Sequence, residues 1–354
     1  MRKLLAAGLV LAAALATGCS ATTTTHRHGP VKLPVGPPGT GASGVLRLGY
    51  LLDVPDAPAL VGTQMGYYQQ ALGKVSLQPQ AFTTQAAEIT ALQAGQLDAA
   101  YLDPISAVTV SQAMHNGLRI VAGAALGGTE LVVSKTITQP GQLKNRQLAA
   151  PTGTPQTAAD TWLRANGLPP LTHTETAPST SAGILHEFTT GTIAGAWEPA
   201  PLDAELSAAG GRILTTDPST QSNNSLPTVV LAVTEKYLTG HRTAVANLIK
   251  GQMQADKLLS VSPVPAEAAF QQKLAQTDNT ALPPTVLTES FAQVTFTDNP
   301  QEAEVRTEIH QAANAGLIKP IANWAAIFDL TQLNALLRSD GGNRQIPKAR
   351  PARP

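Results

Sequence analysis

The chain contains one supersecondary pattern twice, once in each half of its sequence. The first copy covers residues 88–123 and the second covers residues 182–216. Each copy has a helical stretch, a glycine and a short predicted strand with an aromatic residue near its end, Tyr101 or Trp197. An acid and a proline follow in both copies, as Asp103-Pro104 and Glu198-Pro199. Two α/β units of this kind predict two similar lobes that face each other across a cleft for a small ligand.

Strand and helix patterns alternate from Val45 onward, which predicts the α/β fold class with a mainly parallel, helix-flanked sheet in each lobe. Examples are a helix over Ala59–Gln70, a helix over Gln85–Gln93, and strands over Ala99–Leu102 and Thr172–Thr176.

Two β runs stand apart from this alternation, at residues 130–134 and 228–233. We expect them to be the crossings of a two-strand hinge. The first lobe is then predicted over residues 45–129 and 234–339, and the second lobe over residues 135–227. A hinge of two strands suits closure around a ligand.

The N-terminus has the pattern of a signal peptide. Basic residues open it, an apolar run covers residues 4–16, and Leu15-Ala-Thr-Gly precedes Cys19. This run is shorter than the roughly 20 residues that a membrane span needs. One interpretation is an ordinary secretory signal with an incidental cysteine. The preferred one is a bacterial lipobox, in which residues 1–18 are removed and Cys19 becomes the lipid anchor on the outer face of the cytoplasmic membrane. The lack of any other cysteine fits an oxidising compartment without disulfides.

Residues 19–44 and 340–354 lack hydrophobic periodicity and are rich in small, polar or proline residues, so we predict a disordered tether and a disordered tail. The pair His26 and His28 in the tether has the spacing to bind a stray metal ion, but a solvated linker pair is the simpler interpretation. We expect no resident metal and no cofactor.

Composition excludes some classes of function. Of the 354 residues 14% are charged and the formal net charge is zero, so no basic field favours nucleic acid. Phosphate loops, dinucleotide-binding glycine patterns, zinc-protease motifs and serine-nucleophile motifs are missing from the sequence. The histidines are scattered and the one cysteine precedes the predicted fold. We therefore predict a binding protein and not an enzyme.

The predicted strand-to-helix junctions share one chemistry, a short polar residue followed by proline. In open α/β sheets, ligands bind beyond the carboxyl ends of the strands, where these junctions lie. These junctions have two interpretations. In one, each polar residue only caps its helix. In the other, the helix N-termini together present backbone N–H groups to an anionic ligand. Asp103 and Glu198 would repel a bare anion unless they act as caps or the ligand also carries an amine. The junctions are Asp56-Ala-Pro58, Asp103-Pro104, Thr154-Pro155 and Glu198-Pro199.

Two aromatic residues at predicted strand ends have two possible roles. Tyr101 and Trp197 would either line the cleft as apolar or cation–π walls, or belong to the core. The sequence leaves both roles open.

Several segments carry a resemblance to a known family, namely residues 49–73, 85–108, 153–168, 195–206, 226–238, 295–300 and 324–337. They resemble the solute-binding lipoproteins of ABC importers for aliphatic sulfonates, taurine and nitrate, which are related to binders of thiamine precursors. The resemblance implies the two-lobed fold of the type II periplasmic binding proteins. It also implies a monomer that works with an ABC permease and an ATPase.

The resemblance implies a set of ligand contacts. Relatives often have Tyr-x-Gly-Pro after the third strand, and Asp103 takes the glycine position here. They often have Gly-Asn-Thr-Gln before the second-lobe helix, where this chain has Gly153-Thr154-Pro155-Gln156. By this resemblance Thr154 and Gln156 are the expected ligand contacts of the second lobe. Together with the residues identified at the junctions and strand ends, the expected ligand-binding residues are Asp53, Pro58, Tyr101, Asp103, Thr152, Thr154, Gln156, Trp197 and Glu198.

The converging helix N-termini predict an anionic head group, and Asp103 with Glu198 allow an amine on the same ligand. The expected ligand is therefore a small sulfonate, with taurine as the specific candidate. The alternatives are an amine or a pyrimidine such as a thiamine precursor, or a sensor lipoprotein without transport. Enzymes of thiamine and menaquinone biosynthesis share the fold. The pyrimidine-forming ones use a cysteine-rich motif and a histidine that this chain lacks.

Overall fold

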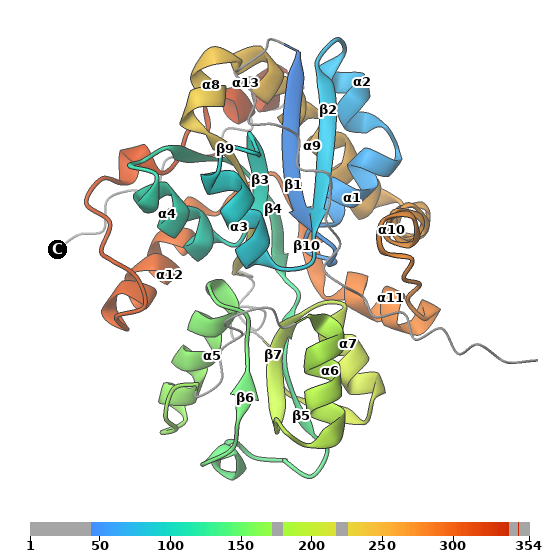
Figure 1. Cartoon of the computed structure of the whole chain (residues 1–354), viewed down its shortest axis with the longest axis vertical. Helices are drawn as coiled ribbons and strands as arrows, with labels where there is room; N and C mark the ends of the chain where they lie inside the picture. The colour runs from blue at the N-terminus through green and yellow to red at the C-terminus, as the bar shows by residue number, and fades with distance from the viewer. Residues whose placement is uncertain (1–43, 172–179, 217–225, 340–345, 347–354) are drawn as a thin grey trace, which may run out of the picture. The chain divides into compact units, whose positions relative to one another are not determined.

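The computed structural model describes residues 44–171, 180–216, 226–339 and 346. The predicted signal peptide with Cys19, the tether with His26 and His28, most of the predicted tail and the strand predicted at residues 172–176 lie outside the described residues. The described part of the chain contains two sheets with flanking helices (Figure 1).

The first sheet has the strand order β10-β4-β9-β3-β1-β2. Strand β1 pairs in parallel with β2 and β3, and β9 lies antiparallel between β3 and β4. Strand β10 closes the edge antiparallel to β4. Thus β1, β2, β3 and β4 all run in one direction. The strands are β1 (Val45–Leu51), β2 (Ser76–Phe82), β3 (Ala99–Leu102), β4 (Leu118–Gly127), β9 (Pro227–Thr234) and β10 (Val294–Phe296).

The second sheet repeats this plan on a smaller scale, with the order β6-β7-β5-β8. Strands β6 and β7 are parallel, and β5 lies antiparallel between β7 and β8. Most strands of each sheet therefore run in one direction; β9 and β10 are reversed in the first sheet, and β5 is reversed in the second. The predicted α/β class with a mainly parallel sheet in each half is confirmed. The strands are β5 (Thr129–Ser134), β6 (Leu148–Ala149), β7 (Gly195–Pro199) and β8 (Gly211–Thr216).

Helices flank both sheets (Figure 1). Around the first sheet they are α1 (Ala57–Gln64), α2 (Tyr67–Leu72), α3 (Gln85–Gln93), α4 (Pro104–Ala113), α8 (Glu235–Gly240), α9 (Arg242–Val261), α10 (Pro263–Asp278), α11 (Pro284–Ala292), α12 (Glu302–Asn314) and α13 (Thr331–Ser339). Around the second sheet they are α5 (Thr154–Ala165), α6 (Ser181–Thr190) and α7 (Leu202–Ala208). No helix in the described part of the chain is both long and apolar enough to cross a membrane.

The predicted helix over Ala59–Gln70 is two helices in the structure. Gly66 has a φ of 71°, a left-handed conformation that ends α1 and starts α2. The break lets Tyr68 fold back over α1, where its ring lies against Gly62. A Cβ at Gly62 would lie 2.3 Å from that ring, so the sharp turn depends on this glycine.

The two β runs predicted as hinge crossings lie inside the sheets. Residues 130–134 belong to β5 and residues 228–233 belong to β9, and both strands have hydrogen-bonded neighbours on each side. The chain instead passes from the first sheet to the second at Gly127 and Gly128, which have φ values of 70° and 77°. Two glycines in this conformation allow the abrupt change of direction that a strand cannot make. The lobe boundaries themselves stay a prediction.

The hydrophobic core is divided among the faces of the two sheets. The largest cluster packs β1, β3 and β9 against α1, α2, α9 and α10. A second cluster fills the opposite face of the first sheet, beneath α3, α4 and α12. The second sheet has a cluster on each face. Each sheet therefore has buried side chains on both faces, and the largest cluster also includes Ala200 and Ala204, which follow β7 of the second sheet.

Candidate ligand-binding site

The loop after β1 is organised by two carboxylates. Asp56 accepts a hydrogen bond at Oδ2 from the backbone N–H of Leu51, at 2.5 Å. Asp53 accepts one at Oδ1 from the N–H of Asp56, at 3.0 Å. Asp56 occupies the N-cap position of α1, yet its side chain caps no N–H of that helix. Asp56 therefore fixes the end of the strand, whereas Asp53 fixes the turn that leads into α1.

The carboxylate of Asp103 caps two helices at once. Its Oδ1 accepts the N–H of Ser106 in α4 at 2.9 Å, as an N-cap residue does. The same oxygen accepts the N–H and the hydroxyl of Thr154, each at 3.0 Å. The amide of Gln85 donates to Oδ2. Because Thr154 is the first residue of α5, one side chain joins the end of β3 in the first sheet to the end of β6 in the second.

Gly153 makes this contact possible. It is the N-cap residue of α5, has a φ of 104° and offers no side chain as a cap. A Cβ at this position would lie 2.5 Å from Oδ2 of Asp103. The glycine therefore lets the Asp103 carboxylate approach the N-terminus of α5, where the backbone N–H groups and the helix dipole favour a negative charge.

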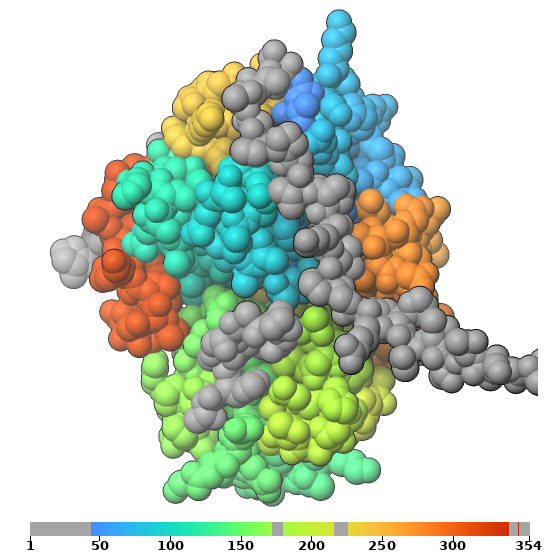
Figure 2. Space-filling model, in the orientation of Figure 1, coloured from blue at the N-terminus to red at the C-terminus, as the bar shows by residue number. Residues whose placement is uncertain are grey.

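A second contact joins the ends of β1 and β7. The N–H of Val54 donates to the carbonyl of Ala200 at 2.9 Å, and the N–H of Ala200 donates to the carbonyl of Gly128 at 3.0 Å. Val54 and Ala200 belong to the same hydrophobic cluster. Helix α5 also lies against α4 and α12, and Figure 2 shows the corresponding surfaces in contact. The strand ends of the two sheets thus meet, as the repeated pattern predicts.

A buried carboxylate without a hydrogen-bond partner lies beside these loops. Glu88 of α3 is 0% exposed, and neither of its carboxylate oxygens has a partner. Burial raises the pKa of Glu88 well above its usual value, and the charges of Asp53 and Asp103 raise it further. An unpaired acid at such depth costs stability, so it calls for an explanation.

Glu88, Asp53 and Asp56 form an acidic group without a cation. Burial raises the pKa of Asp53 to about 7. Burial also raises the pKa of Asp56 well above its usual value, with further contributions from Asp53 and Glu88. The ion pairs found among the described side chains involve none of the three. They are Arg47–Asp98, Arg119–Glu235 and Arg306–Glu302.

A second set of acids lies in the other sheet. Glu130 of β5 and Glu198 of β7 occupy directly opposite positions, and both are buried. Burial raises the pKa of Asp203, in the first turn of α7, and the charge of Glu130 adds to the effect. Over the described part of the chain, no three His, Cys, Asp or Glu side chains are arranged to hold a metal ion.

Both predicted aromatic residues lie in the core. Tyr101 is 1% exposed, and its hydroxyl lies 2.6 Å from that of Tyr68 and donates to Oε1 of Gln252 at 2.9 Å. Trp197 is 0% exposed, and its Nε1 donates to Thr129 at 3.3 Å. Their polar atoms are therefore already paired inside the protein. A role for either ring as a wall of the cleft stays a prediction.

The remaining predicted residues lie close to the same loops. Pro58 is buried in the first turn of α1, and its carbonyl accepts the hydroxyl of Tyr68 at 3.0 Å. Thr152 is exposed, whereas Gln156 is partly buried and its N–H donates to the carbonyl of Pro151. Ligand contact by these residues stays a prediction.

Glu88 is the residue that the sequence prediction missed. Its signal is helical spacing, because Glu88, Ala91 and Leu92 lie at positions i, i+3 and i+4 and share the buried face of α3. An acid on the buried face of a helix is unusual and indicates a candidate functional residue.

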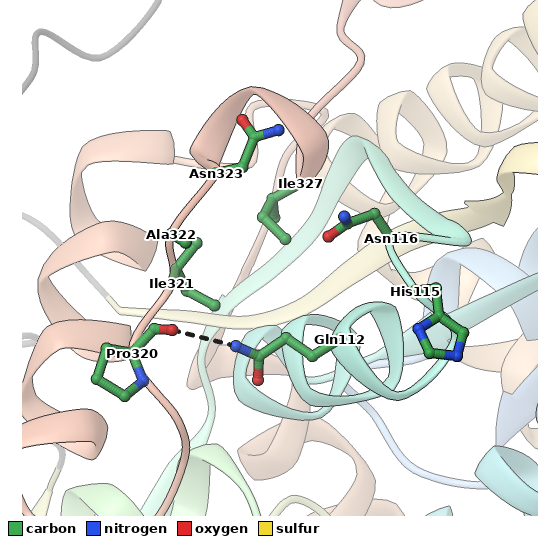
Figure 3. A pocket seen from close by; sticks show the side chains of 8 residues that line it. All are labelled: Gln112, His115, Asn116, Pro320, Ile321, Ala322, Asn323 and Ile327. Carbon is green, nitrogen blue, oxygen red and sulfur yellow. Dashed lines mark hydrogen bonds between the residues drawn. The ribbon is translucent and has the colours of Figure 1, made fainter.

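A separate cavity of about 300 Å³ lies away from these loops (Figure 3). Gln112, at one of its walls, donates to the carbonyl of Pro320. The cavity is at the C-terminal end of α4, a ten-residue helix whose other end carries Asp103. Such a helix is about 15 Å long, so the cavity and the acidic group are distinct. Its lining residues are Gln112, His115, Asn116, Pro320, Ile321, Ala322, Asn323 and Ile327.

The model of the NMT1-like family matches residues 41–277, which is more than half of the chain. The chain belongs to the NMT1-like family. No curated protein sequence matches this NMT1-like protein closely enough to count as a relative.

Solved structures share its fold at low sequence identity. The alkanesulfonate-binding protein SsuA from Xanthomonas axonopodis pv. citri, bound to MOPS, is 20% identical with a TM-score of 0.66, over 81% of this chain and 99% of that one. SsuA from Escherichia coli is 17% identical with a TM-score of 0.65, over 88% and 98%. The nitrate-binding protein NrtA from Synechocystis PCC 6803 is 13% identical with a TM-score of 0.72, over 86% and 91%. The two-lobed fold of periplasmic binding proteins expected from the sequence is thereby confirmed.

Proposed function

We propose that this protein is the extracytoplasmic solute-binding component of an ABC importer, which captures a small solute where the strand ends of its two sheets meet. It then delivers the solute to the permease. The observation that carries the proposal is the pairing of Asp103 with Thr154, which joins the two sheets at the edge where ligands of α/β proteins bind. Proteins of this fold that bind alkanesulfonate and nitrate support it.

We further propose that the protein acts as a lipid-anchored monomer on the outer face of the cytoplasmic membrane, held there by Cys19. The lipobox pattern before Cys19 supports the anchor. A binding role without catalysis agrees with the lack of catalytic motifs in the sequence.

For the ligand, the proposal is a small sulfonate of the taurine type. The N-terminus of α5 attracts negative charge, which suits a sulfonate. In the present arrangement, however, Asp103 takes both the N–H and the hydroxyl of Thr154. A sulfonate at this place would have to displace that carboxylate, so a simple alkanesulfonate fits less well than one that also carries an amine.

A second candidate ligand is an amine or an aminopyrimidine such as a thiamine precursor. The observation that favours it is the acidic group of Glu88, Asp53 and Asp56, which lacks a paired cation. A group of carboxylates attracts a protonated nitrogen and repels an anion.

Binding and closure can be tested together on the full chain. Isothermal titration with taurine, ethanesulfonate and 4-aminopyrimidine would identify the ligand class, and small-angle scattering at saturation would detect compaction. We expect at least one of the three to bind and to reduce the radius of gyration. A protein that binds none of them, and whose radius stays constant with each, would contradict the proposed function.

A further inference from the structure

We propose that Glu88, together with Asp53 and Asp56, forms a subsite for a positively charged nitrogen of the solute. The inference rests on the proposed solute-binding function and specifies which part of the solute these residues recognise. It also gives Glu88 a role as a specificity-determining residue.

The backbone of β1 leaves room for the Glu88 carboxylate. Gly49 of β1 has no side chain, and a Cβ at that position would lie 2.6 Å from Cδ1 of Leu97 and 2.7 Å from Oε1 of Glu88. Any other residue at position 49 would therefore displace Leu97, the Glu88 carboxylate or both. A buried acid that bonds to nothing at such a place is difficult to explain by packing, since an apolar side chain would fill the same space at lower cost.

The acids that interact with Glu88 lie in the loops at the strand ends. Glu88 interacts electrostatically with Asp53 and Asp103, and Asp56 interacts with both Asp53 and Glu88. The acids thus come from α3 and from the loops after β1 and β3. A cationic group among them would neutralise several repulsions at once and give the Glu88 oxygens their missing partner.

Asp103 does not fill this role itself. Its carboxylate already accepts hydrogen bonds from Ser106, Thr154 and Gln85. Asp56 and Asp53 each accept one backbone N–H. Glu88 is the member of the group whose bonding capacity is wholly unused. Asp103 therefore serves the contact between the two sheets, and the Glu88 carboxylate is available to bind the solute.

A matched series of two-carbon solutes tests the subsite on the full chain. Taurine carries an ammonium and a sulfonate, ethanolamine carries the ammonium alone, and isethionate carries the sulfonate with a hydroxyl in place of the amine. We expect taurine and ethanolamine to bind at least tenfold more tightly than isethionate. Glu88→Gln should lower the affinity for both amines at least tenfold and leave isethionate unchanged.

The variant series separates recognition from folding. Glu88→Gln keeps the shape but cannot ionise, so the ligand-free variant should unfold at the same temperature as the wild type or above it. Glu235→Gln, which removes the partner of Arg119 at the surface, is the matched control and should not change any affinity. A structural role for Glu88 would instead lower the unfolding temperature and leave the preference among the three solutes intact.

Two outcomes would overturn the inference. One is isethionate binding as tightly as taurine, with Glu88→Gln having no effect on either; the protein would remain a solute-binding protein. The other is the lack of binding by both amines at 10 mM. If isethionate then binds and compacts the protein, the proposed function stands without the cationic subsite. If no solute of either charge binds, the proposed function fails as well.

Discussion

Oδ1 of Asp103 accepts hydrogen bonds from both the N–H and the hydroxyl of Thr154, each at 3.0 Å. Asp103 follows β3 of the first sheet, Thr154 follows β6 of the second, and both residues are buried. Asp103 therefore acts as a built-in anion at the N-terminus of α5. The proteins that this sequence resembles often have a glycine at the position of Asp103. In this chain the Asp103 carboxylate accepts the N–H of Thr154, so that N–H group is not available to a solute.

Removing the hydroxyl of Thr154 should loosen the contact between the sheets. Thr154→Val keeps the shape but leaves the buried Asp103 carboxylate with one bond fewer, which costs about 1.5–3 kcal/mol for a charged partner. We expect a lower free energy of unfolding in urea and a larger radius of gyration without ligand. Thr239→Val is the control, because that hydroxyl bonds only to carbonyls of its own helix. Equal losses in the two variants would show that the Asp103–Thr154 bond has no special role.

A side chain added at position 153 should also destabilise the protein. Gly153→Ala forces a left-handed φ on alanine, which costs about 1–2 kcal/mol, and brings its Cβ within 2.5 Å of the Asp103 carboxylate. We expect destabilisation by about 2 kcal/mol or more in urea unfolding. Gly183→Ala is the matched control, since Gly183 lies within α6 and a Cβ added there would meet only Thr180, at 3.5 Å. That variant should be neutral or slightly more stable, and an unaffected Gly153→Ala would contradict the close approach.

Much of the fold follows from local sequence patterns. The helix predicted over Gln85–Gln93 and the strand predicted over Ala99–Leu102 agree with α3 and β3 at both ends. Their caps, periodicity and glycine boundaries are all local signals. The predicted helix over Ala59–Gln70 was wrong because the return of Tyr68 over Gly62 is a tertiary contact.

The candidate site was less predictable, for a physical reason. The junction residues Asp103 and Thr154 were identified from local chemistry, but their bond joins residues 51 apart and depends on how the sheets pack. Glu88 shows only a helical spacing in the sequence. That its carboxylate lies unpaired beside Gly49 of β1 depends on how α3 packs on the sheet, which no local pattern shows.

Replacing Cys19 tests the proposed lipid anchor, because this cysteine is the residue that would be acylated. If Cys19 is acylated, Cys19→Ala should release the protein from the membrane fraction into the soluble fraction, because a lipidated N-terminus is what retains it. Immunoblotting of fractionated cells expressing the full chain would measure the shift. Ser20→Ala, which leaves the cysteine in place, is the control and should stay with the membranes. Membrane retention of Cys19→Ala equal to that of the wild type would contradict the lipoprotein assignment.

The acidic group should make stability depend on pH in an unusual direction. Burial raises the pKa of Asp53 from 3.8 to about 7, so between these values the folded protein binds more protons than the unfolded chain. This contribution to stability is fully present below pH 3.8 and is lost as the pH rises through about 7. Asp53→Asn retains an acceptor for the N–H of Asp56 but cannot ionise.

We therefore expect the free energy of unfolding of Asp53→Asn, relative to that of the wild type, to rise steadily from pH 4 to pH 7. Urea titrations at each pH would measure the difference, with Asp278→Asn, an exposed acid on α10, as the control. A cationic solute should reduce the pH dependence of the wild type, since it stabilises the ionised carboxylates. A difference between Asp53→Asn and wild type that stays constant across this range would mean that Asp53 titrates normally and that the acidic group is solvated rather than desolvated.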